Sequence, residues 1–516
     1  MAPSAAGVFD SLTMTSVELW CTSPTGFESI AADEVSDRFS KLGKLHVSCS
    51  RGVVEVCLFG CEGADWLTAL ADVACELQTV EHITAFIFRE DALPPRFTTA
   101  ADAPDAPTAR SEALEWMEHN MREQGAQRLL ELVPLWRAFA RRLSARTINS
   151  SGGLAADVPS DELALHACAQ RGGSHPFSSD EAKRAVAIGL AGGSGLRGAC
   201  RKDFQLTVSV RVHLESFWVG LSLTQQRLAT AEGRQIAPEP SRRSYTTLNP
   251  TLACGLLRAL QLPRAGALVC DPMCGCGTIA EVGRRADFAA ATFFLVGDVD
   301  GGAVDKARRN LLEASRPRGR GVMADVVHWD ATRLPLRDGV LDHLVTDLPF
   351  GKRMGSKQSN RQLYPASERE FHRVLKPDSG SAVLLSADRH ALSLALRAGQ
   401  RWHVSLQRRV TVGGLDALLV KGLPRRERLV GQGQPGGRAH RREQGKYQES
   451  TTSAFDACTW FCLGPRSGWL VAWAVRLRHH VGVCRLTASL LSCGLCVWMA
   501  GAVLARRAYI ITSKGQ

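Results

Sequence analysis

Two short segments, each placed where an apolar run ends, most constrain how this 516-residue chain can fold. Residues 270–278 have the sequence CDPMCGCGT and follow the apolar residues 267–269, while residues 346–351 have the sequence TDLPFG and follow the apolar run 340–345. Short buried runs of this kind are typical of strands in a parallel sheet, whose carboxyl ends lie side by side at a ligand crevice. The two segments are therefore predicted to form neighbouring walls of one binding site.

Further apolar runs and amphipathic segments alternate along the same half of the chain. Strands are expected at 267–270, 293–296, around 326–327, 340–346 and 381–386, helices near 368–375 and 389–398, and a closing antiparallel pair at 404–412 and 415–420. The dipeptide Asn249-Pro250 is a typical helix start. This alternation predicts a doubly wound, Rossmann-like α/β sheet over residues 244–422.

The first segment favours a nucleotide-like ligand. Its glycines let the backbone approach an anionic group at the start of the next helix, and acids after the next two strands can bond a ribose diol and an adenine edge. The expected cofactor-binding residues are Asp271, Pro272, Gly275, Gly277, Asp298, Asp300 and Asp330, with Asp300 alternatively capping the helix from Gly302. The set fits S-adenosylmethionine. It also fits a dinucleotide, because Gly275, Gly277 and Ala280 satisfy the loose G-x-G-x-x-G/A fingerprint.

The second segment favours methyl transfer to an amine. The Asp347 carboxylate and the Leu348 carbonyl can accept the two protons of an exocyclic amine, and Phe350 offers a face on which a base can stack. The expected catalytic residues are Asp347, Leu348, Pro349 and Phe350. The segment does not fix the acceptor, so guanine N2, adenine N6 and a protein glutamine amide all remain open.

The N-terminal half shows the patterns of two smaller α+β units. Residues 17–95 contain a helical run at 26–39, residues 92–108 are expected to form a linker or long surface loop, and residues 111–143 are helical. The second unit, 110–232, contains a predicted hairpin at 206–214 and 217–223 and a capping box formed by Ser178 and Glu181.

Several stretches resemble the THUMP-domain RNA guanine-N2 methyltransferase family. They are residues 24–28, 31–35, 271–275, 346–357, 363–366 and 412–417, with a weaker match at 171–178, and the likeness covers roughly residues 17–422. The resemblance implies a class I methyltransferase sheet preceded by an N-terminal ferredoxin-like domain and a THUMP domain. The chain departs from the family at Cys276, where a hydroxyl residue is usual, and at Gly301-Gly302, which bears on donor affinity more than on chemistry.

Family membership also implies substrates, partners and RNA-contacting residues. The expected substrate is an acceptor-stem guanosine of tRNA, the donor is S-adenosylmethionine, and the expected partner is a small zinc-binding activator subunit. The RNA-binding candidates are Arg171 and His175 in the THUMP signature and a basic loop formed by Lys352, Arg353, Lys357 and Arg361. A noncatalytic RNA-binding protein with a vestigial donor fold is the alternative of a different class.

Composition agrees with an RNA substrate without proving it. The net charge of +12 favours a polyanionic partner, although a coding bias toward arginine would give the same excess. The sixteen cysteines lack the spacing of a disulfide scaffold or a zinc site, so no metal is expected. No secretory signal is apparent, and the expected location is the cytoplasm, with the nucleus as a further compartment.

The last part of the chain, residues 423–516, changes character. It is first basic and rich in Gly, Gln and Pro, which is typical of disorder, and residues 486–505 then form an uncharged run long enough for a membrane helix. Nothing in the family resemblance extends into it. A poorly folded alternative terminus is the favoured interpretation, with a tail anchor as the other.

Overall fold

The computed structural model describes residues 16–60, 64–98, 103–144, 157–198, 204–224, 228, 247–262, 266–284, 292–313, 323–351 and 356–425. Most of the predicted tail, including the apolar run 486–505, lies outside these residues, but its first two residues, 423 and 424, belong to the strand Leu415–Pro424. Within the described ranges, no helix is both long enough and apolar enough to cross a membrane.

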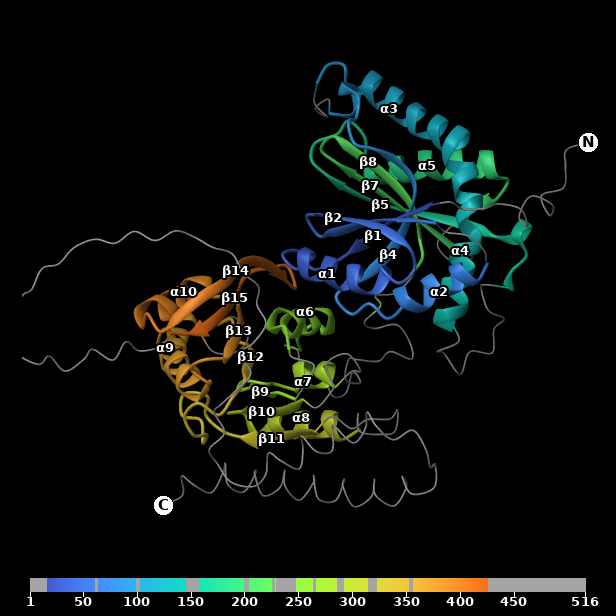
Figure 1. Cartoon of the computed structure of the whole chain (residues 1–516). Coiled ribbons are helices and arrows are strands. Elements are labelled where there is room, and N and C mark those ends of the chain that lie inside the picture. Colours follow the sequence, from blue (N-terminus) through green and yellow to red (C-terminus); the bar gives the residue numbers. More distant parts are fainter. Residues whose placement is uncertain are drawn as a thin grey trace, which may run out of the picture. The chain divides into compact units, whose positions relative to one another are not determined.

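The first sheet has eight strands in the order β2-β3-β1-β4-β8-β7-β5-β6. Figure 1 labels β1, β2, β4, β5, β7 and β8 of this sheet. Its strands are β1 Ser16–Thr22, β2 Lys44–Ser50, β3 Val53–Phe59, β4 His82–Glu90, β5 Ala164–Gly172, β6 Arg197–Gly198, β7 Leu206–His213 and β8 Ser216–Ser222. The predicted hairpin is confirmed, because β7 and β8 pair antiparallel. β4 pairs with β8, so the two predicted α+β units share one sheet. Where one domain ends and the next begins stays a prediction.

The helices of this half share one apolar core with its strands. They are α1 Glu28–Phe39, α2 Ala64–Ala74, α3 Ala106–Asn120, α4 Ala126–Ser144 and α5 Ser179–Ser194, with a π-turn at Met121–Gly125 joining α3 to α4. The capping box at the start of α5 is confirmed, since the Ser178 side chain accepts from the Glu181 N–H and Glu181 accepts from the Ser178 N–H. Gly195 ends α5 in the left-handed conformation, with φ of 73°.

The segment 92–108 is not the simple surface loop that its composition predicted. Phe97 is fully buried, and its ring packs edge-on against Trp116 and Phe177. A short 3-10 helix, Pro95–Phe97, carries this side chain, and α3 already begins at Ala106. One aromatic residue among many polar and small ones thus anchors the segment to the core.

The second sheet has seven strands in the order β11-β10-β9-β12-β13-β15-β14. They are β9 Leu268–Asp271, β10 Phe293–Asp298, β11 Met323–His328, β12 His343–Asp347, β13 Ser381–Ser386, β14 Trp402–Val412 and β15 Leu415–Pro424. The first five are parallel, and β15 and β14 are antiparallel, which confirms the predicted architecture. Its helices are α6 Pro250–Leu260, α7 Thr278–Gly283, α8 Gly301–Glu313, α9 Lys357–Val374 and α10 Arg389–Ala398.

The helix predicted near 368–375 begins eleven residues earlier than expected, at Lys357. Pro365 lies inside it, although an internal proline usually ends or kinks a helix. Ser356 and Ser359 cap the true start reciprocally. Lys357 and Arg361 are therefore helical, and the prediction that they belong to a basic loop was wrong.

A buried carboxylate connects a helix of the first half, α1, to a helix of the second half, α6. Glu34 of α1 is fully buried and accepts hydrogen bonds from the Thr79 N–H at 2.8 Å and from the Arg258 guanidinium of α6 at 2.8 Å. Phe27 packs nearby, where a Cβ added to Gly255 would lie 2.4 Å from its ring. A buried charge of this kind is stable only with such partners, so α1 is fixed against α6.

Candidate active site

The two segments that opened the sequence argument lie next to each other. β9 and β12 are neighbouring parallel strands, with Leu344 opposite Cys270. The chain builds β10 and β11 on one side of β9 and then places β12 on the other side, which makes the gap between β9 and β12 the switch point of the sheet. Asp271 and Asp347 end these two strands on the same edge. The predicted convergence is confirmed.

The loop after β9 is shaped by two glycines in the left-handed region. Gly275 has φ of 54° and Gly277 has φ of 83°, values that other residues rarely adopt. The Gly277 N–H donates to the Cys274 carbonyl at 2.8 Å, and the Asn310 side chain donates to the Cys276 carbonyl at 2.8 Å. The loop is therefore a fixed turn that leads directly into α7.

The acids at and after the ends of β10 and β11 accept hydrogen bonds from backbone N–H groups of the loops around the site. Asp298 accepts the Gly275 N–H at 2.9 Å and the Asp300 N–H at 3.0 Å. The Asp300 carboxylate accepts the Gly302 N–H at 2.9 Å, so it caps α8, which is the alternative that the sequence left open. Asp330 is exposed and accepts the Thr332 N–H at 2.8 Å. The same Asp330 oxygen, Oδ1, also accepts from the Thr332 hydroxyl at 2.8 Å, so Oδ2 is the Asp330 oxygen that could accept from a ligand, whereas each Asp298 oxygen accepts one of the two bonds above and keeps a second lone pair.

Two carboxyl groups at the switch point have pKa values above the usual value for Asp. Burial, with a smaller contribution from Asp271, raises the pKa of Asp347 to about 8. Burial is also the main cause that raises the pKa of Asp271 to about 7. The Oδ1 atom of Asp347 is shielded from solvent and has no hydrogen-bond partner within the described ranges. An unpaired buried acceptor is costly, and a donor group on a ligand would satisfy it.

Sequence reasoning missed the residues that hold the loop after β12. The Pro349 carbonyl accepts from the Tyr364 hydroxyl at 2.6 Å and from the Asn360 side chain at 3.0 Å, and Tyr364 also bonds the Ser386 hydroxyl at 2.6 Å. Asn360 donates to Asp388 as well, at 3.1 Å. Tyr364 lies in the family-like stretch 363–366, which was the available signal, but its contact with residue 349 depends on where α9 begins.

The site fits S-adenosylmethionine on several counts. A Cβ added at Gly275 would meet nothing within 4 Å, so there is open space above the glycine turn for a ligand. The acids that surround this space suit the hydroxyl groups of a ribose and a cationic sulfonium, and not a second phosphate. Asp347, with its unpaired oxygen, lies on the neighbouring strand end.

Of the predicted RNA-binding residues that the structure describes, one is buried and the others are exposed. His175 is buried, with its ring nitrogens 2.6 Å from the Phe97 carbonyl and 3.2 Å from the Gly172 carbonyl, so it supports the fold and does not reach RNA. Arg171 is exposed and donates to the His175 carbonyl at 3.2 Å. Lys357 and Arg361 are exposed on α9. Lys352 and Arg353 lie outside the described residues.

The cysteines near the glycine turn are small core residues. Cys270, Cys274 and Cys276 are buried, and burial raises the pKa of the Cys270 and Cys274 thiols, which disfavours metal-binding thiolates. Among the residues that the structure describes, no group of three or more potential metal ligands occurs, and the cysteines are free thiols.

Comparison with known proteins shows that the part of the chain carrying this site is similar to methyltransferases. Residues 240–417 match the family described as RMKL-like, methyltransferase domain. The chain is 38% identical over 259 residues to the human tRNA (guanine(6)-N(2))-methyltransferase THUMP3, covering 48% of this chain and 49% of that protein. It is 27% identical over 216 residues to the mouse U6 snRNA (guanine-N(2))-methyltransferase THUMPD2, covering 42% of this chain and 37% of that protein. The chain thus spans about half the length of the human relative.

The fold is shared over a longer stretch than the sequence likeness. The crystal structure of TrmN from Thermus thermophilus superimposes with a TM-score of 0.55 at 22% identity, covering 79% of this chain and 99% of that one. The sheet order, the switch point and the family match agree with one another. Residues 240–417 therefore match a methyltransferase-domain family in sequence, and the second sheet has the class I methyltransferase fold.

Proposed function

We propose that this protein is an S-adenosylmethionine-dependent tRNA guanine-N2 methyltransferase, which forms N2-methylguanosine in the acceptor stem at the position that the human relative's name specifies, guanine 6. One observation carries the proposal. Asp347, whose Oδ1 has no partner within the described ranges, ends the strand beside the glycine turn at the switch point. Once it is ionised, which a nearby positive sulfonium would favour by lowering the raised pKa of Asp347, this carboxyl group can hold an amine against a methyl group carried above the turn.

The chain's own residues would bind and orient both reactants. S-adenosylmethionine supplies an electrophilic methyl carbon on a positively charged sulfur. Gly275 and Gly277 would cradle it, Asp298 would accept hydrogen bonds from the ribose, and Asp330 would reach the adenine. Asp271, Pro272 and Asp300 shape the walls of the same crevice.

Asp347 and the loop after it would prepare the acceptor. The carboxylate and the Leu348 carbonyl accept the two amine protons, which aims the nitrogen lone pair at the methyl carbon. Asp347 or water would take the amine proton, and the donor would supply the methyl group to the nitrogen and keep the electron pair of the broken C–S bond on its sulfur. Pro349 and Phe350 would position the flipped base, with Phe350 stacking on it.

The N-terminal half would dock the tRNA. We assign residues 17–95 to a ferredoxin-like domain and 110–232 to a THUMP domain, on the strength of the family resemblance and the shared sheet. Arg171, Lys352, Arg353, Lys357 and Arg361 are proposed to contact phosphates around the target nucleotide. A small zinc-binding activator subunit is the proposed partner, and the cytoplasm the proposed location.

The test is direct. The purified chain, with and without the activator subunit, would be incubated with methyl-labelled donor and total RNA, followed by nucleoside analysis. Label in N2-methylguanosine from tRNA supports the proposal, and label in N6-methyladenosine or in protein overturns the acceptor. A chain that binds the donor but methylates nothing in either condition is the noncatalytic alternative.

A second acceptor has specific support. The match to a U6 snRNA guanine-N2 methyltransferase shows that related sequences act on another RNA with the same chemistry. Separating tRNA from small nuclear RNA before the nucleoside analysis distinguishes the two. The identity is lower for this relative, 27% against 38%, which is why tRNA is the first choice.

A further inference from the structure

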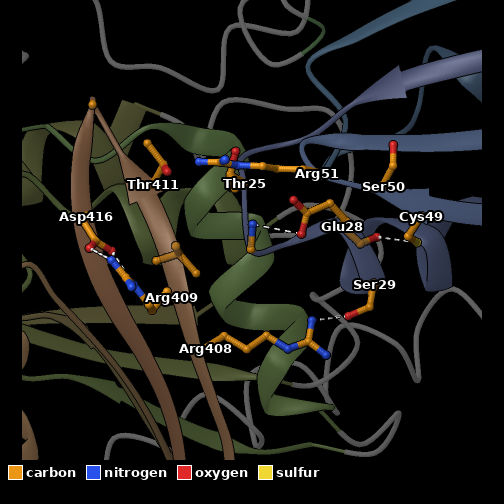
Figure 2. A pocket seen from close by; sticks show the side chains of 13 residues that line it. Thr25, Glu28, Ser29, Cys49, Ser50, Arg51, Arg408, Arg409, Thr411 and Asp416 are labelled. Carbon is orange, nitrogen blue, oxygen red and sulfur yellow. Dashed lines mark hydrogen bonds and ion pairs between the residues drawn. The ribbon is translucent and has the colours of Figure 1, made fainter. Parts of the chain in front are cut away.

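We infer that a groove at the joint between the first sheet and the β14–β15 hairpin binds a backbone phosphate of the RNA, an inference that rests on the proposed function. The groove has a volume of about 780 Å³. Three segments line it: the start of α1 with the loop before it, the turn between β2 and β3, and the hairpin residues 408–416 (Figure 2). The lining therefore comes from both the proposed docking half and the catalytic half.

The walls of the groove contact each other through both main-chain and side-chain groups. The Thr411 N–H of β14 donates to the Thr25 carbonyl at 2.9 Å. Gly26 has φ of +94°, and a Cβ at this position would lie 2.4 Å from the Arg409 carbonyl oxygen. The Arg408 guanidinium donates to the Ser29 hydroxyl, as Figure 2 shows. The groove is thus a fixed feature of the joint.

The acidic residues in the lining are already neutralised or bonded. Glu28 accepts the Gly26 N–H at 2.9 Å with one carboxylate oxygen and the Gly52 N–H at 2.7 Å with the other. Asp416 forms ion pairs with Arg409 and, at 3.2 Å, with Arg389. Each of these carboxylates therefore has a partner that offsets its repulsion of an anion.

The basic residues keep donors for a ligand. Arg51, in the turn between β2 and β3, is exposed and has no hydrogen bond or ion pair within the described ranges. Arg408 uses one nitrogen for Ser29 and has other N–H groups to offer. A guanidinium presents donors in a planar fork that matches two oxygens of a phosphate.

The rest of the lining indicates which part of an RNA would bind. Four residues carry hydroxyl groups: Thr25, Ser29, Ser50 and Thr411. Arginine and hydroxyl side chains are the usual partners of phosphate oxygens. None of the described lining residues is aromatic, so the groove offers no surface on which a base could stack. The contact would therefore position the RNA without reading its sequence.

The groove lies on the edge of the sheet that carries the candidate active site. Leu418 of β15 pairs with Ser386, the last residue of β13. Asp416 and the hairpin tip before it therefore extend beyond the carboxyl ends of the parallel strands. Asp347 ends β12 at that same edge, next to β13. An RNA strand held at the groove would continue along the edge where the acceptor amine must be placed.

The experiment measures tRNA binding by the full chain as a function of salt concentration. Replacing Arg51 with Ala should lower the magnitude of the slope of log K against log salt by about 0.7–0.9, the value for one lost phosphate contact. Affinity at low salt should fall about tenfold, as for one charge-assisted hydrogen bond. Arg51→Lys should retain most of the slope because it keeps the charge.

The matched control is Lys44→Ala. Lys44 is exposed at the start of β2, the strand whose end leads into the turn that carries Arg51, and it does not line the groove. Equal effects of the two alanine variants, or no effect of Arg51→Ala, would overturn the groove as a phosphate site. Failure of the unsubstituted chain to bind and methylate tRNA would overturn both proposals. Normal methylation with an unchanged salt slope in Arg51→Ala would overturn the groove alone.

Discussion

Tyr364 is expected to control the geometry of methyl transfer without touching either reactant. Its hydroxyl bonds the Pro349 carbonyl and the Ser386 hydroxyl, both at 2.6 Å, and it is 2% exposed. Burial raises the pKa of this phenol, so it stays a neutral donor at every working pH. Replacing it with Phe removes one oxygen and keeps the ring, so the change isolates the two hydrogen bonds.

The size of the effect follows from these contacts. A buried polar group left unsatisfied costs about 1–3 kcal/mol, and Ser386 would lose its Tyr364 contact while Pro349 would keep only Asn360. If that cost appears as displacement of the loop from its catalytic position, kcat falls roughly 5- to 150-fold. The glycine turn is held by separate contacts from Asp298 and Asn310, so donor affinity should stay unchanged.

Single-turnover methylation of tRNA and donor-binding calorimetry would separate the two effects. The matched control is Trp402→Phe, which deletes a buried hydrogen bond of 2.7 Å to Glu368. Trp402 pairs with Pro424 at the other end of the hairpin, away from the catalytic edge. The reasoning is refuted if Tyr364→Phe keeps full kcat, or if Trp402→Phe reduces kcat by the same factor at equal loss of thermal stability.

Three other variants and conditions test the site. Asp347→Asn should keep donor affinity within about twofold and lower the transfer rate by at least about a hundredfold, the range for loss of a general base, as measured by calorimetry and label transfer. Because the pKa values of Asp347 (about 8) and Asp271 (about 7) lie above the usual value for Asp, the folded protein binds more protons than the unfolded chain, so thermal stability without donor should fall as pH rises from about 4 to about 8. Asp347→Asn should flatten that profile, and an unchanged profile would contradict the assignment. Gly275→Ala should lower the melting temperature, because φ of 54° strains a residue with a Cβ even though that Cβ meets nothing within 4 Å, and it should also weaken donor binding.

The sheet of the catalytic half was predictable because local signals agreed there. Short apolar runs, a proline at the start of α6 and glycines after β9 each act within a few residues. The main miss was the start of α9, which lies eight residues before the internal Pro365. The helix continues through the proline, and the serine cap at Ser356 carried a weaker signal than the usual acid at the third position.

Only those parts of the site that lie at strand ends could be predicted from the sequence. The prediction that Asp271 and Asp347 lie at one crevice follows from the topology of parallel sheets, and no side-chain detail was needed. The roles of Asp300 and His175 depended on neighbours that sequence spacing does not reveal. Asp300 bonds two positions away, whereas His175 bonds the Phe97 carbonyl from another segment. Short-range capping could be anticipated, but burial of His175 could not.

The contacts between the two halves could not be predicted from the sequence, for a physical reason. Glu34 and Arg258 lie 224 positions apart, and nothing in the local pattern of α1 or α6 shows that the glutamate is buried. An isolated buried carboxylate is so unfavourable that its partners must be in place whenever the chain is folded. The main-chain bond from Thr411 to Thr25 adds a second connection between the same two halves. The half proposed to dock RNA and the half proposed to transfer the methyl group are therefore held in a fixed register, which a reaction dependent on placing one amine at one carboxylate would require.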